Sequence, residues 1–537
     1  MRSDSSALNS SVALVVGSSP YFGMASDDPS KKLYRELRAL PWHRIWTDRV
    51  ARFDRATPRE RLDGVAWIRA VGVVFSESGL PSDKEDVRRW LLQLLKDPEE
   101  KVRRYAMAAL PKVGVDAHAE QELLALTRIA TSKREETYVA KALGKVGGLA
   151  AAQAIATSNR FDVQSVQQAN ATLARLQQRS RIPLDRVLSD VQGVLLHLRS
   201  RRGLEGILAD EVKEQGRFSV VDVRPGCVAV RSTGGFSLRD VFALRCFGSV
   251  GFVLDRVSAS SDEASKEKIA AAIASPRALQ IFGAFTEGAF RYRLDFVEKG
   301  HQRGAVRSIA ARAYALCPQI LNDPREAPWA IDIHSTPDGE SVELRPRLSP
   351  DPRFSYRLDD IPAASHPPLA ACMARVGGKK ENEMVWDPFC GSGLELIERA
   401  RLGGVRKIFG TDLSAEAIDI AEKNLKAAQL PSVDSSFSHC DFRDFARLRK
   451  LNPGSLTLII TNPPLGRRVP IPNLRGLFND LFATAATLLQ PGGRLVLTNP
   501  FPVENGHRLL KRELRHLVDM GGFDCHLEVY RKAKAKG

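Results

Sequence analysis

The sequence lacks any apolar run of the length that a membrane helix needs. That length is about 20 residues, and the run Val12–Val16 near the start is far shorter. No signal-peptide core or cleavage pattern is clear in the first residues either. We therefore expect a soluble protein with no membrane partner.

Cysteine pairing is also absent. The seven cysteines among 537 residues are an odd number, and no two of them stand in a CxxC pair. The pattern indicates neither a disulfide framework nor a zinc site. We therefore expect no metal and predict a cytoplasmic location.

Acidic residues are fewer than basic residues in this chain. The chain has 79 Lys and Arg against 63 Asp and Glu, a formal net charge of +16. This excess suits a polyanionic partner such as nucleic acid, although many basic proteins bind none. Hydrophobic residues make up 43% of the chain, enough for packed cores. At roughly 150 residues per domain, the length predicts three or four domains.

The N-terminal third has helical periodicity but no chemical motif. Residues 1–30 are rich in Ser and Gly, and we expect them to be disordered, with helices over 31–190. Residues 104–114 align with 137–147 at an offset of 33. A helix is predicted over Val87–Leu95, and the next is predicted to start at Pro98 behind an Asp97 cap.

This repeat resembles HEAT-like helical hairpins, which stack because one copy cannot bury its apolar face alone. Two interpretations stay open. The region is either a scaffold that binds RNA or a protein partner, or a helical bundle that only packs on the rest of the chain.

Residues 195–350 have the pattern of a mixed α+β region. Strands are predicted at Phe218–Val223, Cys227–Arg231, Phe290–Phe296 and Ala330–His334. A helix is predicted over Ser237–Leu244.

From Met384 onward strands and helices alternate, which predicts a parallel, doubly wound sheet. Turn residues are expected at Gly492-Gly493. The predicted strands and helices, in order, are strands 384–386, 407–410, 456–460 and 494–498, and helices 394–402, 414–429 and 474–489.

Glycines and carboxylates follow these strands, at the edge where doubly wound folds bind ligands. The loop Asp387–Gly393 reads DPFCGSG, and its glycines allow a tight turn and the close approach of a ligand. Asp412 ends the next strand, where a carboxylate can accept hydrogen bonds from ribose hydroxyls. The loop departs from GxGxxG, so a nicotinamide cofactor is the weaker alternative.

Two motifs carry a resemblance to a known family. DPFCGSG and, after a later strand, TNPPLGRR (461–468) resemble the amino-group methyltransferases with a [D/N/S]PP[Y/F/W] motif. More narrowly, the chain resembles RNA guanine-N2 methyltransferases that carry a THUMP domain. Residues 354–357 resemble the linker into the family's catalytic domain, and 202–205 resemble the opening of its N-terminal module. The resemblance is specific over about 350–500, weaker over 200–350 and absent before 195.

The resemblance implies a multidomain architecture. A THUMP-like, ferredoxin-like α+β region that binds RNA is expected over 195–350, between the helical repeats and the C-terminal domain. That last domain, over 355–535, is expected to be an α/β Rossmann-like methyltransferase. The implied activity is N2-methylation of guanine in tRNA or rRNA.

The resemblance also implies S-adenosylmethionine as the cofactor and assigns roles to residues. The first motif holds the amino-acid end of the cofactor, Asp412 binds its ribose, and Asp441 with Phe442 contacts its adenine. The expected cofactor-binding residues are Asp387, Pro388, Phe389, Cys390, Gly391, Ser392, Gly393, Asp412, Leu413, Asp441 and Phe442. The expected catalytic residues are Asn462, Pro463, Pro464 and Leu465, and the expected substrate-binding residues are Gly466, Arg467 and Arg468.

The chemistry of an aryl amine explains why such a motif is needed. Its lone pair is delocalised into the ring, so the amine is a weak nucleophile. The Asn462 amide oxygen and the Pro463 carbonyl can accept its two N–H bonds and so orient the lone pair, without a strong base. The target base must leave its stack to reach such a pocket.

One position departs from the family pattern. The family has an aromatic residue where this chain has Leu465, so stacking on the base must come from Phe478 or another aromatic, or be replaced by an apolar lid. Three alternatives therefore stay open: a DNA adenine-N6 methyltransferase, a non-catalytic RNA-binding scaffold, and a protein-glutamine methyltransferase. His366 is either a residue that closes over the cofactor or one where a helix begins, and Cys390 is expected to be a packing residue.

Overall fold

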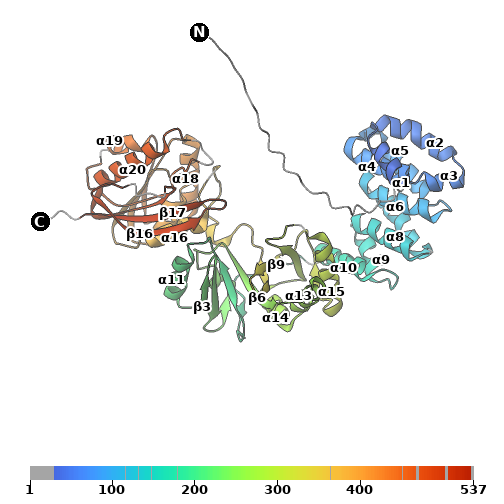
Figure 1. Ribbon diagram of the computed structural model, residues 1–537, viewed down its shortest axis with the longest axis horizontal. Helices are drawn as coiled ribbons and strands as arrows, with labels where there is room; N and C mark the ends of the chain where they lie inside the picture. The colour runs from blue at the N-terminus through green and yellow to red at the C-terminus, as the bar shows by residue number, and fades with distance from the viewer. Residues whose placement is uncertain are drawn as a thin grey trace, which may run out of the picture. The chain divides into compact units, whose positions relative to one another are not determined.

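The computed structural model describes ten segments of the chain, which form two compact units, one ending at Phe161 and one beginning at Asp162 (Figure 1). Residues 1–28 are outside the described range, and with them nearly all of the segment expected to be disordered. None of the described helices is both long and apolar enough to cross a bilayer. The described segments are 29–114, 116–130, 132–146, 148–177, 179–300, 302–362, 364–449, 451–466, 471–501 and 506–533.

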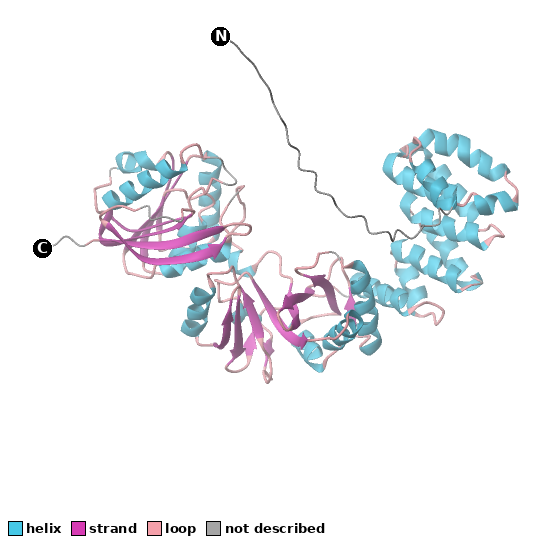
Figure 2. Ribbon diagram, in the orientation of Figure 1, coloured by secondary structure: helices cyan, strands magenta, loops and turns pink. Residues whose placement is uncertain are grey.

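The described part of the first unit is helical throughout (Figure 2). Its helices follow one another with short connections. A short π-helical segment lies at Arg44–Arg49, and a 3₁₀ turn lies at Pro81–Asp83. The α-helices are α1 (Pro29–Arg38), α2 (Val50–Arg55), α3 (Pro58–Asp63), α4 (Ala66–Ser78), α5 (Lys84–Leu94), α6 (Glu100–Val113), α7 (Ala117–Ile129), α8 (Lys133–Val146) and α9 (Leu149–Ala156).

The sequence repeat corresponds to two helix pairs. Helices α5 and α7 begin 33 residues apart, and so do α6 and α8. Helix α6 packs between α4 and α8. The approach of α4 to α6 is close, since a Cβ at Gly72 would lie 2.8 Å from the Cβ of Ala109. Arg103 joins the two copies through a 2.5 Å bond to Glu135, whose side chain is buried.

The predicted start of α6 is wrong by two residues. The helix begins at Glu100 with Glu99 at the N-cap, and neither Pro98 nor Asp97 takes the expected position. The Asp97 carboxylate accepts a hydrogen bond from the Glu99 amide at 2.9 Å, which makes a turn before the helix. An aspartate two residues before the N-cap is equally able to form this turn, so the sequence signal for a cap at Asp97 was ambiguous.

The second unit begins with α10 (Val163–Gln177) and continues into an eight-stranded sheet of order β3-β4-β2-β6-β10-β9-β7-β8. A separate pair joins β1 (Val187–Leu188) to β5 (Phe236–Ser237). The strands of the large sheet are β2 (Leu196–Arg199), β3 (Phe218–Arg224), β4 (Cys227–Ser232), β6 (Ser249–Val257), β7 (Phe290–Phe296), β8 (Ile320–Asn322), β9 (Trp329–Thr336) and β10 (Gly339–Pro346).

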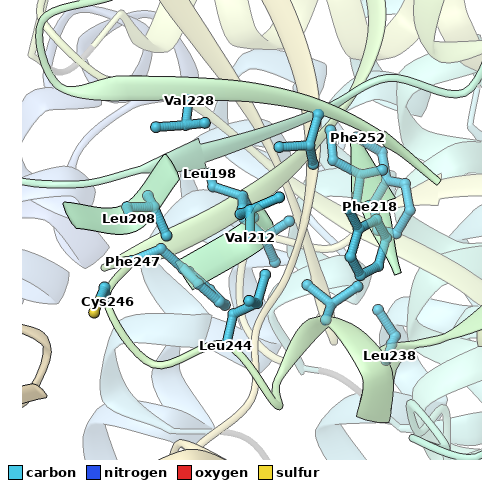
Figure 3. Close-up of a cluster of buried hydrophobic side chains, with 14 of the residues drawn as sticks. Leu198, Leu208, Val212, Phe218, Val228, Leu238, Leu244, Cys246, Phe247 and Phe252 are labelled. Atoms are coloured by element: carbon cyan, nitrogen blue, oxygen red, sulfur yellow. The ribbon is translucent and has the colours of Figure 1, made fainter. Parts of the chain in front are cut away.

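One face of this sheet buries an apolar core against helices. Figure 3 shows Leu198 and Phe252 of the sheet beside Leu208 and Val212 of α11, together with Phe247. The helix predicted over Ser237–Leu244 is shorter, because it ends after one turn. The helices here are α11 (Glu205–Gln215), α12 (Leu238–Val241), α13 (Asp262–Ile273), α14 (Pro276–Phe285) and α15 (Arg303–Leu316).

The C-terminal part is a seven-stranded Rossmann-like sheet of order β13-β12-β11-β14-β15-β17-β16. Its first five strands in this order are parallel. They are β13 (Asp434–His439), β12 (Val405–Asp412), β11 (Glu383–Asp387), β14 (Leu456–Thr461) and β15 (Leu489–Asn499). The helices are α16 (Pro367–Val376), α17 (Leu394–Arg401), α18 (Ala415–Ala427), α19 (Phe445–Arg449) and α20 (Leu474–Leu488), with 3₁₀ turns at Pro352–Phe354 and Phe442–Asp444.

The prediction of a parallel sheet is wrong at one edge. Strand β17 (Asp524–Lys532) runs antiparallel to β15 and to β16 (Leu510–Asp519). The leucines of β16 at 510, 514 and 517 have helical spacing, which hides the strand from a reading of the sequence. The turn expected at Gly492-Gly493 lies inside β15, where the register with β14 shifts.

The loop before β6 and α17 are joined by hydrogen bonds to a buried carboxylate. Arg245 donates two bonds of 2.6 Å to the Glu398 carboxylate of α17, which also accepts from the Tyr356 hydroxyl at 2.6 Å. A bidentate guanidinium–carboxylate pair sets direction as well as distance. The helix after the DPFCGSG loop is therefore held by the loop that leads into β6 of the middle sheet.

Candidate active site

Three neighbouring parallel strands bring the predicted polar residues to one edge of the sheet. Strand β11 lies between β12 and β14 and pairs with both in parallel. Asp387 ends β11, Asp412 ends β12, and Asn462 directly follows β14. The carboxyl ends of parallel strands meet at the same edge of a sheet, so these three residues lie along one edge. Asp387 is the central one, because its strand lies between the other two.

The loop after β11 needs its glycines. Gly391 has φ +50° and Gly393 has φ +83°, which are backbone conformations that side chains rarely adopt. A Cβ at Gly393 would also lie 3.3 Å from the Cβ of Ala421 on α18. The loop is tied to β12 by the Cys390 amide, which donates to the carbonyl of Thr411 at 2.9 Å.

The carboxylate of Asp412 is held by backbone amides. It accepts hydrogen bonds from Gly391 at 3.0 Å and from Ser414 at 2.9 Å, one on each oxygen. Each oxygen keeps a lone pair for a further donor. The next side chain, Leu413, is 71% exposed, an uncovered apolar surface beside the carboxylate. This pair has the chemistry to receive a ribose with its attached flat base.

Asp387 is a buried carboxyl group with unused bonding capacity. One oxygen accepts from the Phe389 amide at 3.0 Å. The other oxygen, Oδ2, is buried without a well-formed hydrogen bond among the described residues, although the Thr461 hydroxyl lies near the carboxyl. Burial, and then the charge of Glu395, raise the pKa of Asp387 well above its usual range. A cationic ammonium group would satisfy both the open oxygen and the charge.

Glu395 was not predicted from the sequence. It lies in the first turn of α17, is 3% exposed, and its pKa is raised by burial. A glutamate at a helix start reads as a favourable partner of the helix dipole, and only the fold shows that it lies close to Asp387. The buried edge of the sheet therefore holds two carboxyl groups.

Asn462 is held from two sides. Its Nδ2 donates to the Ser365 hydroxyl at 2.8 Å, and its Oδ1 accepts from the Thr498 hydroxyl. Ser365 in turn donates to Glu395. The Oδ1 atom has a second lone pair free for a substrate N–H. Neither Ser365 nor Thr498 was predicted, because they lie 97 and 36 residues away in the sequence.

The proposed stacking residue Phe478 is wrong. Its side chain is fully buried, and it packs edge-on against Phe501 with ring centroids 5.3 Å apart. Leu465 and Phe501 are half-buried members of the same apolar cluster. A ring that is enclosed in the core cannot stack on a base, so Phe501 is the better candidate from position and exposure.

The remaining predicted residues differ in how they are placed. Phe442 is buried and packs on Phe389 with centroids 5.0 Å apart, while Asp441 is bonded to Arg443 at 2.8 Å. Cys390 is buried, and burial raises the pKa of its thiol, as fits a packing residue. His366 is the N-cap residue of α16, which favours its interpretation as the residue where that helix begins.

Asn424 was also missed by sequence reasoning. This fully buried residue of α18 donates 3.0 Å bonds to the carbonyls of Ser392 and Asp359 and accepts from the Leu358 amide at 2.9 Å. It thereby joins the cofactor-loop candidate to the linker before the domain. Of the second motif, Pro463 is buried, Pro464 is half-buried and Gly466 is exposed, whereas Arg467 and Arg468 lie outside the described residues.

The raised pKa of Asp387 predicts a pH dependence of stability. The folded state holds this proton more tightly than the unfolded chain, so stability is full below the ordinary value of 3.8 and is lost as the pH rises through the raised pKa. Asp387→Asn removes this loss, and the melting temperature of the variant should exceed that of the wild type increasingly with pH. The exposed carboxylate Asp434 offers the control Asp434→Asn. Parallel pH profiles of the wild type and Asp387→Asn would contradict the assignment.

Residues 355–501 match the family described as the RMKL-like methyltransferase domain. The tRNA (guanine(10)-N2)-dimethyltransferase of Methanocaldococcus jannaschii is 29% identical over 181 residues, which cover 32% of this chain and 47% of that protein. The ribosomal protein L11 methyltransferase of Desulfatibacillum aliphaticivorans is 32% identical over 123 residues, covering 21% of this chain and 39% of that protein. The chain thus spans half or less of the length of these two relatives.

A likeness in structure extends further along the chain. The crystal structure of TrmN from Thermus thermophilus matches with a TM-score of 0.50 and 20% identity, covering 63% of this chain and 99% of that one. At this identity the likeness concerns the fold. The C-terminal part therefore has a Rossmann-like methyltransferase fold, joined to mixed sheets and an all-helical N-terminal region.

Proposed function

We propose that this chain is an S-adenosylmethionine-dependent RNA methyltransferase that forms N2-methylguanine in tRNA or rRNA. The observation that carries the proposal is the placement of Asn462, with one amide lone pair free, at the same sheet edge as Asp387 and Asp412. The relative named as a tRNA guanine-N2-dimethyltransferase supports the choice of base and nucleic acid.

The residues of the edge fit the cofactor. Asp387 receives the ammonium of its amino-acid end, for which the open Oδ2 is suited, since a bound cation would offset the burial that raises the pKa of this carboxyl group. Asp412 receives the ribose hydroxyls, and the turn with Asp441 and Phe442 receives the adenine, beside the exposed Leu413. When bound, the cofactor supplies an electrophilic methyl group on a sulfonium.

On the substrate side, the residues contribute by positioning the base amine. The Asn462 Oδ1 atom and the Pro463 carbonyl accept the two N–H bonds of the base amine, which aims its lone pair. Ser365 and Thr498 prevent the amide of Asn462 from rotating. With the cofactor bound, these residues would hold the amine nitrogen toward the methyl group that the cofactor supplies, and the N–H proton displaced by the transfer would leave to solvent.

The other parts of the chain receive corresponding assignments. We assign a THUMP-like RNA-binding role to 195–350, the methyltransferase domain to 355–535 and HEAT-like repeats to the part of 31–190 that lies in the first unit, which ends at Phe161. The helix pairs at an offset of 33 support the last of these. The mixed sheet β3-β4-β2-β6-β10-β9-β7-β8 is the scaffold of the middle region.

A direct assay tests the proposal. The purified chain is incubated with isotope-labelled S-adenosylmethionine and, separately, with unmodified tRNA, unmodified rRNA, DNA and ribosomal protein. We expect label in RNA and N2-methylguanosine in a digest analysed by mass spectrometry. Label in N6-methyladenine of DNA, or in protein alone, would overturn the proposal.

A further inference from the structure

Four helices of the first unit present a common outer face. Helix α4 contacts α1 and α6, and α6 contacts α8, so the four lie side by side. The sides of α6 and α8 that contain Ala106 and Ala140 are buried. Residues at i, i+4 and i+7 on the opposite sides are exposed or half-buried, among them Lys112 and Lys145.

This outer face is rich in positive charge. We call it the basic face and define it by Arg38, Arg69, Arg104, Lys112, Lys141 and Lys145. Lys112 and Lys145 occupy the same position in the two repeat copies. Among the described residues, no ion pair involves Arg69, Lys112, Lys141 or Lys145.

The charges on the basic face lie near enough to repel one another. Partial burial lowers the pKa of Lys112, and the charges of Lys145, Arg69 and Arg38 lower it further, opposed only by Glu77. These groups come from α8, α4 and α1. Arg38 and Arg104 pair with Glu77 at 2.7 Å and with Glu100 at 3.0 Å. The uncompensated positive charge of this surface therefore comes from Arg69, Lys112, Lys141 and Lys145 on α4, α6 and α8.

Tyrosine rings lie among these cations. The Arg69 guanidinium lies 4.1 Å from the centroid of the Tyr34 ring. Arg104 lies 5.5 Å from the Tyr138 ring and thereby bridges α6 to α8, and Lys141 lies 6.0 Å from the same ring. Half-buried tyrosines beside cations are suited to stack on bases or pack on sugars.

The opposite helices show no such excess. On α5 and its neighbours Arg89 pairs with Asp86 at 3.1 Å, Lys96 with Glu122 at 2.9 Å, and Arg88 with Asp116 at 2.8 Å. Helices α5 and α7 together carry four basic and four acidic residues, whereas α6 and α8 together carry eight basic and three acidic residues. The segregation of charge points to a polyanion on one side.

We propose that the basic face binds the sugar–phosphate backbone of the RNA substrate, through a unit other than the one that contains Asp387 and Asn462. The identity of the polyanion as RNA rests on the proposed function. Neighbouring helices lie about 10 Å apart, which corresponds to about three phosphate steps of one strand in a duplex. Cations on α4, α6 and α8 can therefore contact spaced phosphates along one strand and release its counterions.

Charge reversal on the full chain tests this surface. The variant carries Lys112→Glu and Lys145→Glu, and the matched control carries Arg89→Glu and Lys96→Glu on the opposite side, with the same change in net charge. Affinity for unmodified tRNA and for a short RNA hairpin is measured between about 50 and 200 mM salt. We expect the basic-face variant to bind at least about tenfold more weakly, with a salt slope shallower by about two. The control should stay close to the wild type.

Each outcome discriminates. Wild-type affinity and slope in the basic-face variant overturn the proposal, and so does an equal loss in the control, which would report net charge alone. A loss of binding to polyglutamate but not to RNA would assign the face to an acidic protein instead. Circular-dichroism melting shows whether both variants are folded. If no RNA is methylated but the basic-face variant still loses RNA binding, the proposed function fails and this surface stands.

Discussion

Asn462→Ala should lower the kcat of methyl transfer by a factor on the order of 10²–10³, the usual cost of losing one positioned hydrogen-bonding group at a reacting centre. The amide oxygen is the acceptor that aims the amine, and alanine offers none. The dissociation constant of S-adenosylmethionine should stay within about twofold, because the residues assigned to the cofactor lie at the ends of β11 and β12 and in the turns after β12 and β13, whereas Asn462 follows β14. Single-turnover methylation and calorimetric titration measure the two quantities.

A second variant makes the assignment specific. Asp412→Ala should weaken cofactor binding, because the ribose loses its acceptor and the Gly391 and Ser414 amides lose their partner. Ser365→Ala is a milder companion to Asn462→Ala, since it removes the Nδ2 contact and leaves the Thr498 contact. If Asn462→Ala abolished cofactor binding, or if Asp412→Ala lowered only kcat, the two roles would be wrongly assigned.

Glu383→Ala should destabilise the C-terminal domain by about 3–5 kcal/mol, the cost of breaking a buried ion pair from one side. Glu383 begins β11 and has no exposed surface, and it pairs with Arg399 of α17 and Arg494 of β15. Both guanidinium groups are buried, so the variant leaves two charges without a carboxylate. Hydrogen exchange of the β11 and β15 amides measures the loss within this domain of the multidomain chain.

The nearby Glu381 is the matched control. Its side chain is 76% exposed and lies 3.9 Å from Lys379, so Glu381→Ala should change stability by less than about 0.5 kcal/mol. Replacing Glu383, Arg399 and Arg494 together by leucine should recover much of the loss, since no buried charge then lacks a partner. A Glu383→Ala domain as stable as the control would show that the triad contributes little.

The polar residues at the strand ends could be predicted, because the carboxyl ends of parallel strands always lie at the same edge of the sheet. Asp387, Asp412 and Asn462 each follow an apolar strand, and three adjacent strands bring them to one edge. Their hydrogen-bonding partners were not predictable. Ser365, Glu395 and Asn424 act across long sequence distances, and nothing local separates them from ordinary surface or capping residues.

Hydrophobic periodicity did not identify the secondary structure of β16, because the same leucine spacing can occur in a helix and in a strand. The leucines of β16 are spaced as on a helix, yet the segment pairs with β17 over nine registered residue pairs. Conversely, the repeat at an offset of 33 could be found because a stack of helix pairs imposes the same apolar spacing twice. Phe478 was misplaced because aromatic character alone does not tell a core ring from an exposed one.

The repeat of α5–α6 as α7–α8 has a consequence for how such a chain can vary. Helix pairs in a stack contact only their neighbours, so the stability of the stack is a sum of terms for each pair and for each interface between adjacent pairs. A duplication or deletion of 33 residues would then lengthen or shorten the row of helices by about 10 Å per pair. The area that the helices present to a partner could therefore grow or shrink by one helix pair at a time, while the sequence of the C-terminal domain stays unchanged.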